Sequence, residues 1–192
     1  MDTPGGFALI GQAISFAARA HRHQLRRDRE TPYVAHPVRV CLVVRHVFGI
    51  DDPVVLAAAV LHDTIEDTTT DYDDLIGRFG AEVAGCVAAM SKDTRLPEAE
   101  REAAYLDRLV SGDWRVAVCK LADGYDNLSD FAALSPAARA KQVGNVSEYL
   151  DAVRPRLPAE ARRAFEIVDA AVASLRAAVE SQDAEGDPCG NC

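Results

Sequence analysis

The segment VVLAAAVLHDTIED, residues 54–67, joins a run of eight apolar residues to one histidine and three acidic residues. A run that is apolar on every face predicts a helix buried on all sides. Asp52 and Pro53 supply an N-cap and a first-turn proline for this helix. The segment therefore predicts a central helix over 53–67, whose C-terminal end carries charged groups into the core.

The polar residues of this segment can border one pocket. Residues four apart lie on the same face of a helix, so His62 lies over Glu66 and Asp63 over Asp67. Several buried carboxylates without counter-charges cost many kcal/mol, or shift their pKa values until they become neutral. A divalent cation removes this penalty, and the segment therefore predicts a metal ion among these groups.

Helical periodicity and capping signals continue along most of the chain. Thr70 and Asp73 resemble a capping box, and Gly80 is well placed to end the helix that begins there. No alternating strand pattern or two-residue hairpin turn is present. We expect a single all-α domain over 1–182 and a disordered polar tail over 183–192. The expected helices cover about 7–22, 36–48, 53–67, 71–79, 81–90, 97–110 and 114–123, followed by one from Ser135–Pro136 and one from Pro158.

Composition and charge disfavour several classes of function. The 192 residues include 30 acidic and 21 basic ones, and the resulting net charge of −9 opposes generic binding to nucleic acid or anionic membranes. No run approaches the roughly 20 apolar residues of a membrane span, and the chain does not begin with the basic region of a signal peptide. We expect a cytoplasmic protein that binds neither nucleic acid nor membrane. Any phosphate ligand then needs locally clustered Arg and Lys.

The cysteines fall into two groups. Cys41, Cys86 and Cys119 lie in apolar stretches and are predicted to be small buried hydrophobes. Cys189 and Cys192 form CGNC in the polar tail. We expect this pair to be solvated, because one C-x-x-C supplies only half of a structural zinc site.

Two further candidate ligands stand at similar helix boundaries. His36 in PYVAHPV and Asp123 in VCKLADGYDN each follow an apolar stretch that would hold them near the core. Together with His62 and Asp63 they provide two imidazoles and two carboxylates, and no thiolate. This mixed nitrogen and oxygen shell suits manganese, iron or zinc better than calcium.

Three motifs in this order resemble those of a known family. PYVAHP (32–37), LHDTIED (61–67) and KLADGYDN (120–127) are similar to the metal-binding motifs of HD-domain phosphohydrolases. More narrowly, they resemble the hydrolase domain of Rel/SpoT-type alarmone enzymes, including the small stand-alone hydrolases of that group. The resemblance covers about residues 7–130 and implies a single HD-domain helical bundle.

The resemblance assigns roles to the acidic and imidazole groups. In that family the residues equivalent to the four candidate ligands hold one metal ion, which is commonly manganese. For this chain, zinc or iron are alternatives. Glu66 and Asp67 match the acidic pair that positions and deprotonates the attacking water. The implied metal ligands are His36, His62, Asp63 and Asp123.

The resemblance also points to substrate contacts. Arg26, followed by Arg27, matches a family arginine that contacts the nucleotide base, and Asn127 aligns with an asparagine near the ribose and the 3′-phosphate. Tyr33 could pack against the substrate or cap the core. Weaker candidates for holding diphosphate oxygens are Lys92, Arg95 and Arg101.

The implied reaction removes pyrophosphate from the 3′ position of guanosine tetra- or pentaphosphate and returns GDP or GTP, which reverses the stringent response. No G-x-x-x-x-G-K-[ST] loop is present, and we expect no synthetase partner domain. Where the family commonly reads KLADRLHN, this chain has Gly124 and Asp126, and Asp130 stands near a family threonine. These departures leave open an HD phosphohydrolase for an adenosine alarmone or a phosphorylated dinucleotide, or an inactive nucleotide-binding module.

The remaining polar and aromatic residues are predicted to be structural. The histidines outside the motifs are expected at the surface or at helix ends, and Trp114 in the core. The helix after Pro158 could complete the core or form a contact in a homo-oligomer. The histidines concerned are His21, His23 and His46.

Overall fold

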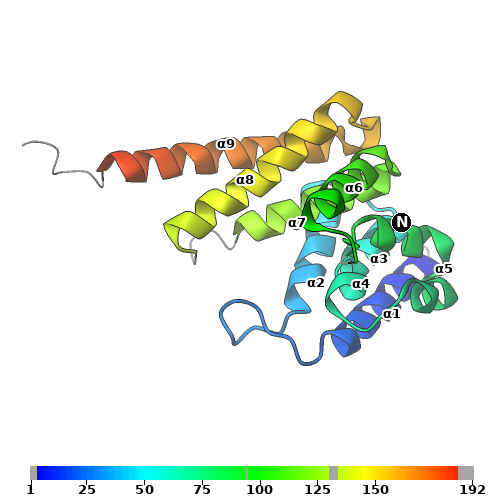
Figure 1. Cartoon of the computed structure of the whole chain (residues 1–192). Coiled ribbons are helices and arrows are strands. Elements are labelled where there is room, and N and C mark those ends of the chain that lie inside the picture. The colour runs from blue at the N-terminus through cyan, green and yellow to red at the C-terminus, as the bar shows by residue number, and fades with distance from the viewer. Residues whose placement is uncertain (1–3, 94, 130–133, 186–192) are drawn as a thin grey trace, which may run out of the picture.

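The computed structural model describes residues 4–93, 95–129 and 134–185, and the regular structure within these ranges is helical (Figure 1). Pairing of β type in the described part of the chain is limited to one isolated antiparallel bridge between Leu25 and Pro32. The predicted all-α fold is confirmed. None of the helices in the described ranges has the length and apolar character needed to cross a membrane.

The helices follow the predicted order closely. Short 3₁₀ turns at Arg154–Arg156 and Ala159–Ala161 join the last two helices. The helices are α1 (Pro4–Ala20), α2 (Ala35–Leu42, continued by a π turn over Val43–Val47), α3 (Pro53–Leu61), α4 (Thr64–Asp67), α5 (Tyr72–Ala89), α6 (Glu98–Ser111), α7 (Trp114–Ser129), α8 (Pro136–Val153) and α9 (Arg162–Glu185).

Helix α3 lies at the centre of the fold. Its residues from Val55 to Leu61 are almost completely removed from solvent. Helices α1, α2, α5 and α7 all pack against it, so every face of the helix meets protein. This arrangement explains why the segment is apolar all round, and it fixes the C-terminal end of α3 in the interior.

The last two helices cover α7. Helices α8 and α9 pack against each other and against α7, as Figure 1 shows. Phe165, Val168 and Val172 of α9 belong to the buried core, so the helix after Pro158 completes the core. Helix α9 includes residues 183–185, which were expected in the disordered tail. The rest of that tail, with Cys189 and Cys192, lies outside the described residues.

Helix α5 differs in detail from the prediction. The capping box is formed by Asp71 and Asp74, one residue later than expected. Thr70 is not the cap, and its hydroxyl oxygen lies 2.9 Å from Thr68 Oγ1 in the preceding turn. Gly80 has φ +82° and interrupts the helical conformation before the chain continues to Ala89, so the predicted break at this glycine is confirmed.

The central helix ends earlier than predicted. Instead of running to residue 67, α3 stops at Leu61 and α4 begins at Thr64. Side-chain donors replace part of the main-chain ladder here, because His62 Nδ1 bonds the carbonyl of Ala59 at 2.9 Å and Thr64 Oγ1 bonds that of Leu61 at 2.7 Å. The interruption leaves His62 and Asp63 at a junction between two helices.

The smaller structural predictions are mostly confirmed. Cys41, Cys86 and Cys119 are buried, and burial raises the pKa of the first two thiols to about 11. Trp114 is partly buried and packs against the core.

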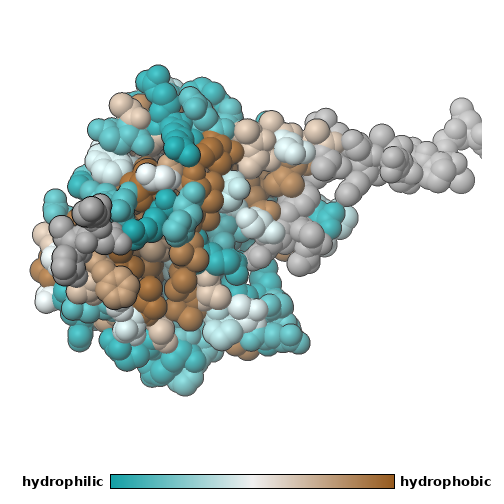
Figure 2. Space-filling view, turned by 180° about the vertical axis from the view of Figure 1, so that it is seen from behind, coloured by the Kyte–Doolittle hydropathy of each residue, from teal (hydrophilic) through white to brown (hydrophobic). Residues whose placement is uncertain are grey.

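The surface opposite to the view of Figure 1 carries a band of hydrophobic side chains between hydrophilic ones (Figure 2).

Asp52 joins the start of α3 to α7. Its Oδ1 accepts hydrogen bonds from the backbone N–H groups of Val54 and Val55, at 2.9 and 3.0 Å, and its carboxylate pairs with Arg115 at 3.0 Å. Burial raises the pKa of Asp52, but the hydrogen bonds from Arg115 and Val55 outweigh it and hold the pKa below the ordinary value of 3.8.

We expect Asp52→Ala to lower the free energy of unfolding by about 1 to 2 kcal/mol, because it removes the helix cap and the ion pair together. A carboxylate with a lowered folded-state pKa stabilises above its unfolded pKa and loses this contribution as the pH falls through the folded value. The difference from wild type should therefore be full at neutral pH and shrink below pH 3.8. Urea unfolding of wild type and variant at neutral pH and below pH 3.8 measures this difference in free energy. A difference that does not depend on pH would contradict the assignment.

Candidate metal centre

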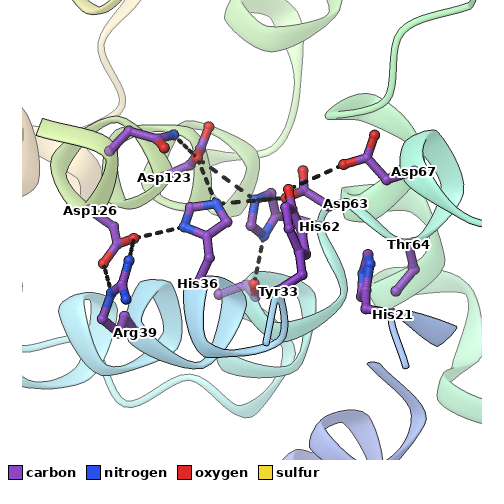
Figure 3. Close-up of polar contacts among 12 residues, drawn as sticks. His21, Tyr33, His36, Arg39, His62, Asp63, Thr64, Asp67, Asp123 and Asp126 are labelled. Atoms are coloured by element: carbon purple, nitrogen blue, oxygen red, sulfur yellow. Dashed lines mark hydrogen bonds and ion pairs between the residues drawn. The ribbon is translucent and has the colours of Figure 1, made fainter. Parts of the chain in front are cut away.

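Three helices bring the predicted ligands together (Figure 3). His36 lies in the first turn of α2, His62 and Asp63 lie between α3 and α4, and Asp123 lies within α7. Helices α2, α3 and α7 pack pairwise against one another. As a result, one ligand atom from each of His36, His62 and Asp123 lies within 4.8 Å of the others, and all three residues are buried.

The ligand atoms surround a common point. Asp123 Oδ1 lies 3.2 Å from His36 Nε2 and 3.8 Å from His62 Nε2. Asp63 Oδ2 lies 3.0 Å from His62 Nε2 and 3.6 Å from His36 Nε2. Two nitrogens and two carboxylate oxygens thus face one another across a space that suits a single ion.

The other ring nitrogens show that this donor set fits a metal. His62 Nδ1 contacts the carbonyl of Ala59, and His36 Nδ1 contacts Asp126 Oδ2 at 2.7 Å. Neither acceptor has a proton to give, so each Nδ1 donates and each Nε2 can present a lone pair to the centre. His62 Nε2 is buried without a hydrogen bond of acceptable geometry, although Asp63 lies close to it. A divalent cation would satisfy this buried nitrogen and both carboxylates.

The charges of the centre reinforce one another. Burial lowers the pKa of His62, but Asp63 and Asp123 raise it to about 9. Burial raises the pKa of Asp63, whereas the neighbouring His62 lowers it to about 2. The carboxylates therefore attract a positive charge into the centre, and a metal ion would bind there in place of a proton.

Tyr33 lies beside the centre and contacts its carboxylates. The hydroxyl lies 2.6 Å from Asp63 Oδ2 and 3.1 Å from Asp67 Oδ2, and its pKa is raised by burial and by these two acids, so it remains a donor. The ring packs against His21, with 4.9 Å between the ring centroids. His21 lies just after α1, as predicted for a helix end, but it is buried rather than at the surface. The sequence pattern did not reveal this burial, because His21 stands at the start of the polar turn that follows α1.

Glu66 and Asp67 lie on α4, three and four residues after the candidate ligand Asp63. Glu66 Oε2 accepts a hydrogen bond from the backbone N–H of Lys92 at 3.0 Å. Burial is the largest influence on the Glu66 carboxyl, and its pKa lies above the ordinary value. The carboxylate is thus anchored at one oxygen and is well suited to accept a proton.

A pocket of about 310 Å³ opens beside His36, Asp63 and Asp123. Arg26 and Asn127 contribute to its wall, together with Arg27 and Tyr33. The Arg26 guanidinium carbon lies 5.8 Å from the centroid of the Tyr33 ring. The structure therefore brings four of the predicted substrate contacts and three of the predicted metal ligands to one cavity.

The other predicted cations lie elsewhere. They are held by acidic residues of their own region and do not line the 310 Å³ pocket. Lys92 Nζ bonds Glu102 at 2.7 Å, and Arg101 lies 3.5 Å from the same carboxylate. Arg95 pairs with Asp93 at 2.7 Å and has a side chain that is 87% exposed.

Two side chains hold Asp123 in place. Lys120 was not identified from the sequence, and Asn127 was predicted only as a substrate contact. Lys120 Nζ donates to Asp123 Oδ2 at 2.8 Å, while Asn127 Nδ2 donates to Oδ1 at 2.6 Å. The spacing of three between Lys120 and Asp123 on one helix was an available signal.

The two acidic residues that depart from the family pattern are Asp126 and Asp130. Asp126 is buried and lies against His36 and Arg39, whereas Asp130 lies outside the described residues.

This arrangement of helices and ligands is that of an HD domain. The family described as HD domain matches residues 13–151, and the chain belongs to this family. Among characterised proteins it is similar to guanosine-3′,5′-bis(diphosphate) 3′-pyrophosphohydrolase MESH1 of Homo sapiens. The two are 40% identical over 145 residues, which cover 75% of this chain and 80% of the human protein.

Further relatives agree with this placement. MESH1 of Drosophila melanogaster is 36% identical over 130 residues, covering 67% of this chain and 73% of the fly protein. A solved structure, described as a metazoan ortholog of SpoT that hydrolyzes ppGpp, superposes with a TM-score of 0.71 at 30% identity. That match covers 83% of this chain and 93% of the other.

Proposed function

We propose that the protein is a metal-dependent hydrolase that removes the 3′-diphosphate of guanosine tetra- or pentaphosphate and releases pyrophosphate with GDP or GTP. The observation that carries the proposal is the convergence of His36, His62 and Asp123 in a chain 40% identical to a 3′-pyrophosphohydrolase. With Asp63 as fourth ligand, these residues would hold one divalent ion, manganese first, with zinc or iron as alternatives.

When bound, such an ion acts as a Lewis acid and can lower the pKa of water from about 16 to about 7, worth roughly 12 kcal/mol at about 1.4 kcal/mol per unit. The protein's own residues then complete the reaction. Glu66, anchored by Lys92, accepts a proton from the attacking water, and Asp67, held by Tyr33, orients that water. The water oxygen bonds to phosphorus as the bond to the ribose 3′ oxygen breaks, and that oxygen takes up the proton that Glu66 has accepted.

The 310 Å³ pocket would hold the nucleoside. The guanidinium of Arg26 is held over the Tyr33 ring, where its flat face can stack on a base. Arg27 supplies positive charge to the same wall, and the position of Asn127 beside Asp123 supports a contact to the ribose or 3′-phosphate.

We expect Arg26→Ala to raise KM about 10-fold or more while kcat changes little. The arginine contributes binding rather than chemistry, and a charged contact is worth about 1.5 to 3 kcal/mol. Steady-state kinetics with guanosine tetraphosphate and Mn²⁺ measure both constants. Arg22→Ala is the matched control, because Arg22 is exposed and bonds the carbonyl of Arg19. A large fall in kcat at unchanged KM would reject the assignment.

A second candidate substrate class is favoured by Gly124. A cavity of about 170 Å³ lies between α7 and α8, beside Asp123, and Gly124 forms part of its lining. A Cβ at this position would lie only 3.4 Å from the side chain of Val146, so glycine lets the two helices pack closely here and adds no side chain to the cavity lining. The space could accept part of a different phosphorylated nucleotide, such as an adenosine alarmone or a phosphorylated dinucleotide.

A substrate panel separates these functions. Purified protein is incubated with Mn²⁺ and with guanosine or adenosine 3′-diphosphates and phosphorylated dinucleotides, and chelator controls accompany each reaction. Release of pyrophosphate from guanosine tetraphosphate, abolished by chelator, is the expected result. Cleavage of another nucleotide alone would favour the second class. Tight binding with no cleavage would favour a nucleotide-binding module and overturn the enzymatic proposal.

A further inference from the structure

Asp126 lies behind His36, on the side of the imidazole away from the metal ligands (Figure 3). Its carboxylate is 3% exposed, and Oδ2 lies 2.7 Å from His36 Nδ1. The opposite nitrogen, Nε2, faces Asp63 and Asp123. The imidazole of His36 therefore bridges a buried carboxylate and the metal centre.

Arg39 completes this arrangement from the neighbouring turn of α2. Its Nε and Nη2 donate to the two oxygens of Asp126, at 2.7 and 2.9 Å. Because Arg39 lies three residues after His36, both side chains lie on the same face of α2, opposite Asp126 on α7. The bidentate pairing neutralises the buried carboxylate and fixes its plane.

The two histidines obtain their orientation by different means. For His62, the carbonyl of Ala59 three residues earlier accepts the Nδ1 hydrogen. For His36, the corresponding carbonyl of Tyr33 already accepts the backbone N–H of His36 at 2.9 Å. The Nδ1 hydrogen of His36 instead bonds to Asp126, a side chain from another helix.

We propose that Asp126 is a positioning residue for His36, which acts on metal affinity by fixing the orientation and the tautomer of the imidazole. A carboxylate can only accept, so the proton is placed on Nδ1 and the lone pair on Nε2. Residues that orient metal-binding histidines typically contribute 10- to 100-fold to metal affinity. The inference rests on the metal centre of the proposed function, and it requires no particular nucleotide.

The direct test measures Mn²⁺ affinity by calorimetric titration of protein that has been freed of metal with chelator. Asp126→Ala should bind Mn²⁺ about 10- to 100-fold more weakly than wild type. Asp126→Asn should retain most of the affinity, because its amide oxygen can still accept from His36 Nδ1. Arg39→Ala should lose less Mn²⁺ affinity than Asp126→Ala, since the hydrogen bond between Asp126 and His36 remains.

A matched control separates positioning from general stability. Asp52→Ala removes a partly buried carboxylate that also pairs with an arginine of another helix and lies at the opposite end of α3 from His62. Thermal unfolding of each metal-free variant shows how far it is destabilised. Asp52→Ala should be destabilised and yet bind Mn²⁺ with the affinity of the wild type.

Three results would overturn the inference. The first is wild-type Mn²⁺ affinity in folded Asp126→Ala, and the second is an equal loss of affinity in Asp52→Ala and Asp126→Ala. The third is a wild-type protein that binds no Mn²⁺, which would remove the metal centre as well. A protein that binds Mn²⁺ but cleaves no nucleotide would refute the proposed reaction and leave the role of Asp126 intact, so the two failures are distinguishable.

Discussion

His62→Ala and Asp63→Ala are each expected to lose metal binding and nucleotide hydrolysis together. His62 Nε2 is a buried nitrogen without a hydrogen bond, and Asp63 Oδ2 is the oxygen closest to it at 3.0 Å. Removing either leaves an incomplete donor set, and the roughly 12 kcal/mol of water activation is lost with the ion. Activity should therefore fall below detection rather than by a moderate factor.

Metal content after dialysis against Mn²⁺, measured on the same preparations as the activity, tests this expectation. His46→Ala is a suitable control, because this histidine is exposed and lies outside the centre. It should keep both metal and activity. Circular dichroism shows whether the variants remain helical. A folded His62→Ala protein that still binds one equivalent of Mn²⁺ would show that the ligand assignment is wrong.

Glu66→Ala is expected to retain the metal and to lower kcat by about 10²- to 10⁴-fold, the range that general bases typically contribute. Glu66 lies on α4 and accepts a hydrogen bond from the backbone N–H of Lys92, and within the described part of the chain its side chain is not hydrogen-bonded to any of the four candidate ligands. Its loss should remove proton transfer and leave the donor set intact. Glu66→Gln, which preserves an acceptor for the Lys92 N–H group, should be similarly slow.

Stopped assays at saturating Mn²⁺, together with metal analysis, distinguish the roles of these residues. Glu82→Ala provides the control, because Glu82 is an exposed glutamate on α5. It should behave as wild type. If Glu66→Ala lost the ion, the division between metal ligands and water-activating residues would have to be abandoned.

The central helix and the ligand segments could be predicted because they depend on neighbours in the sequence. Asp52 caps α3 and Pro53 occupies its first turn, as the preferences of these residues for helix starts predict. A helix that is apolar on all faces has to be buried. The predicted convergence of His36, His62 and Asp123 is confirmed. It could be predicted because an apolar stretch before each residue holds it near the core. The catalytic and substrate-binding roles stay predictions.

Contacts between distant segments could not be predicted in the same way. The sequence shows Asp126 as an acid close to a metal ligand, but its pairing with Arg39 depends on how α2 packs against α7. The same holds for Lys92 and Arg101, whose common partner Glu102 is fixed only when α6 is in place. The end of α3 at Leu61 depends on side-chain hydrogen bonds that compete with the helix, which periodicity does not reveal.

The candidate ligands come from three segments that are widely separated along the chain, so a disordered chain cannot present them to one ion. Binding of the proposed divalent ion would therefore be thermodynamically linked to folding, because an ion that binds only the native state adds about 2.7 kcal/mol of stability at a concentration 100 times its Kd. The melting temperature of the protein should consequently rise with the supply of free ion. Metal scarcity would then reduce the amount of folded enzyme as well as its turnover.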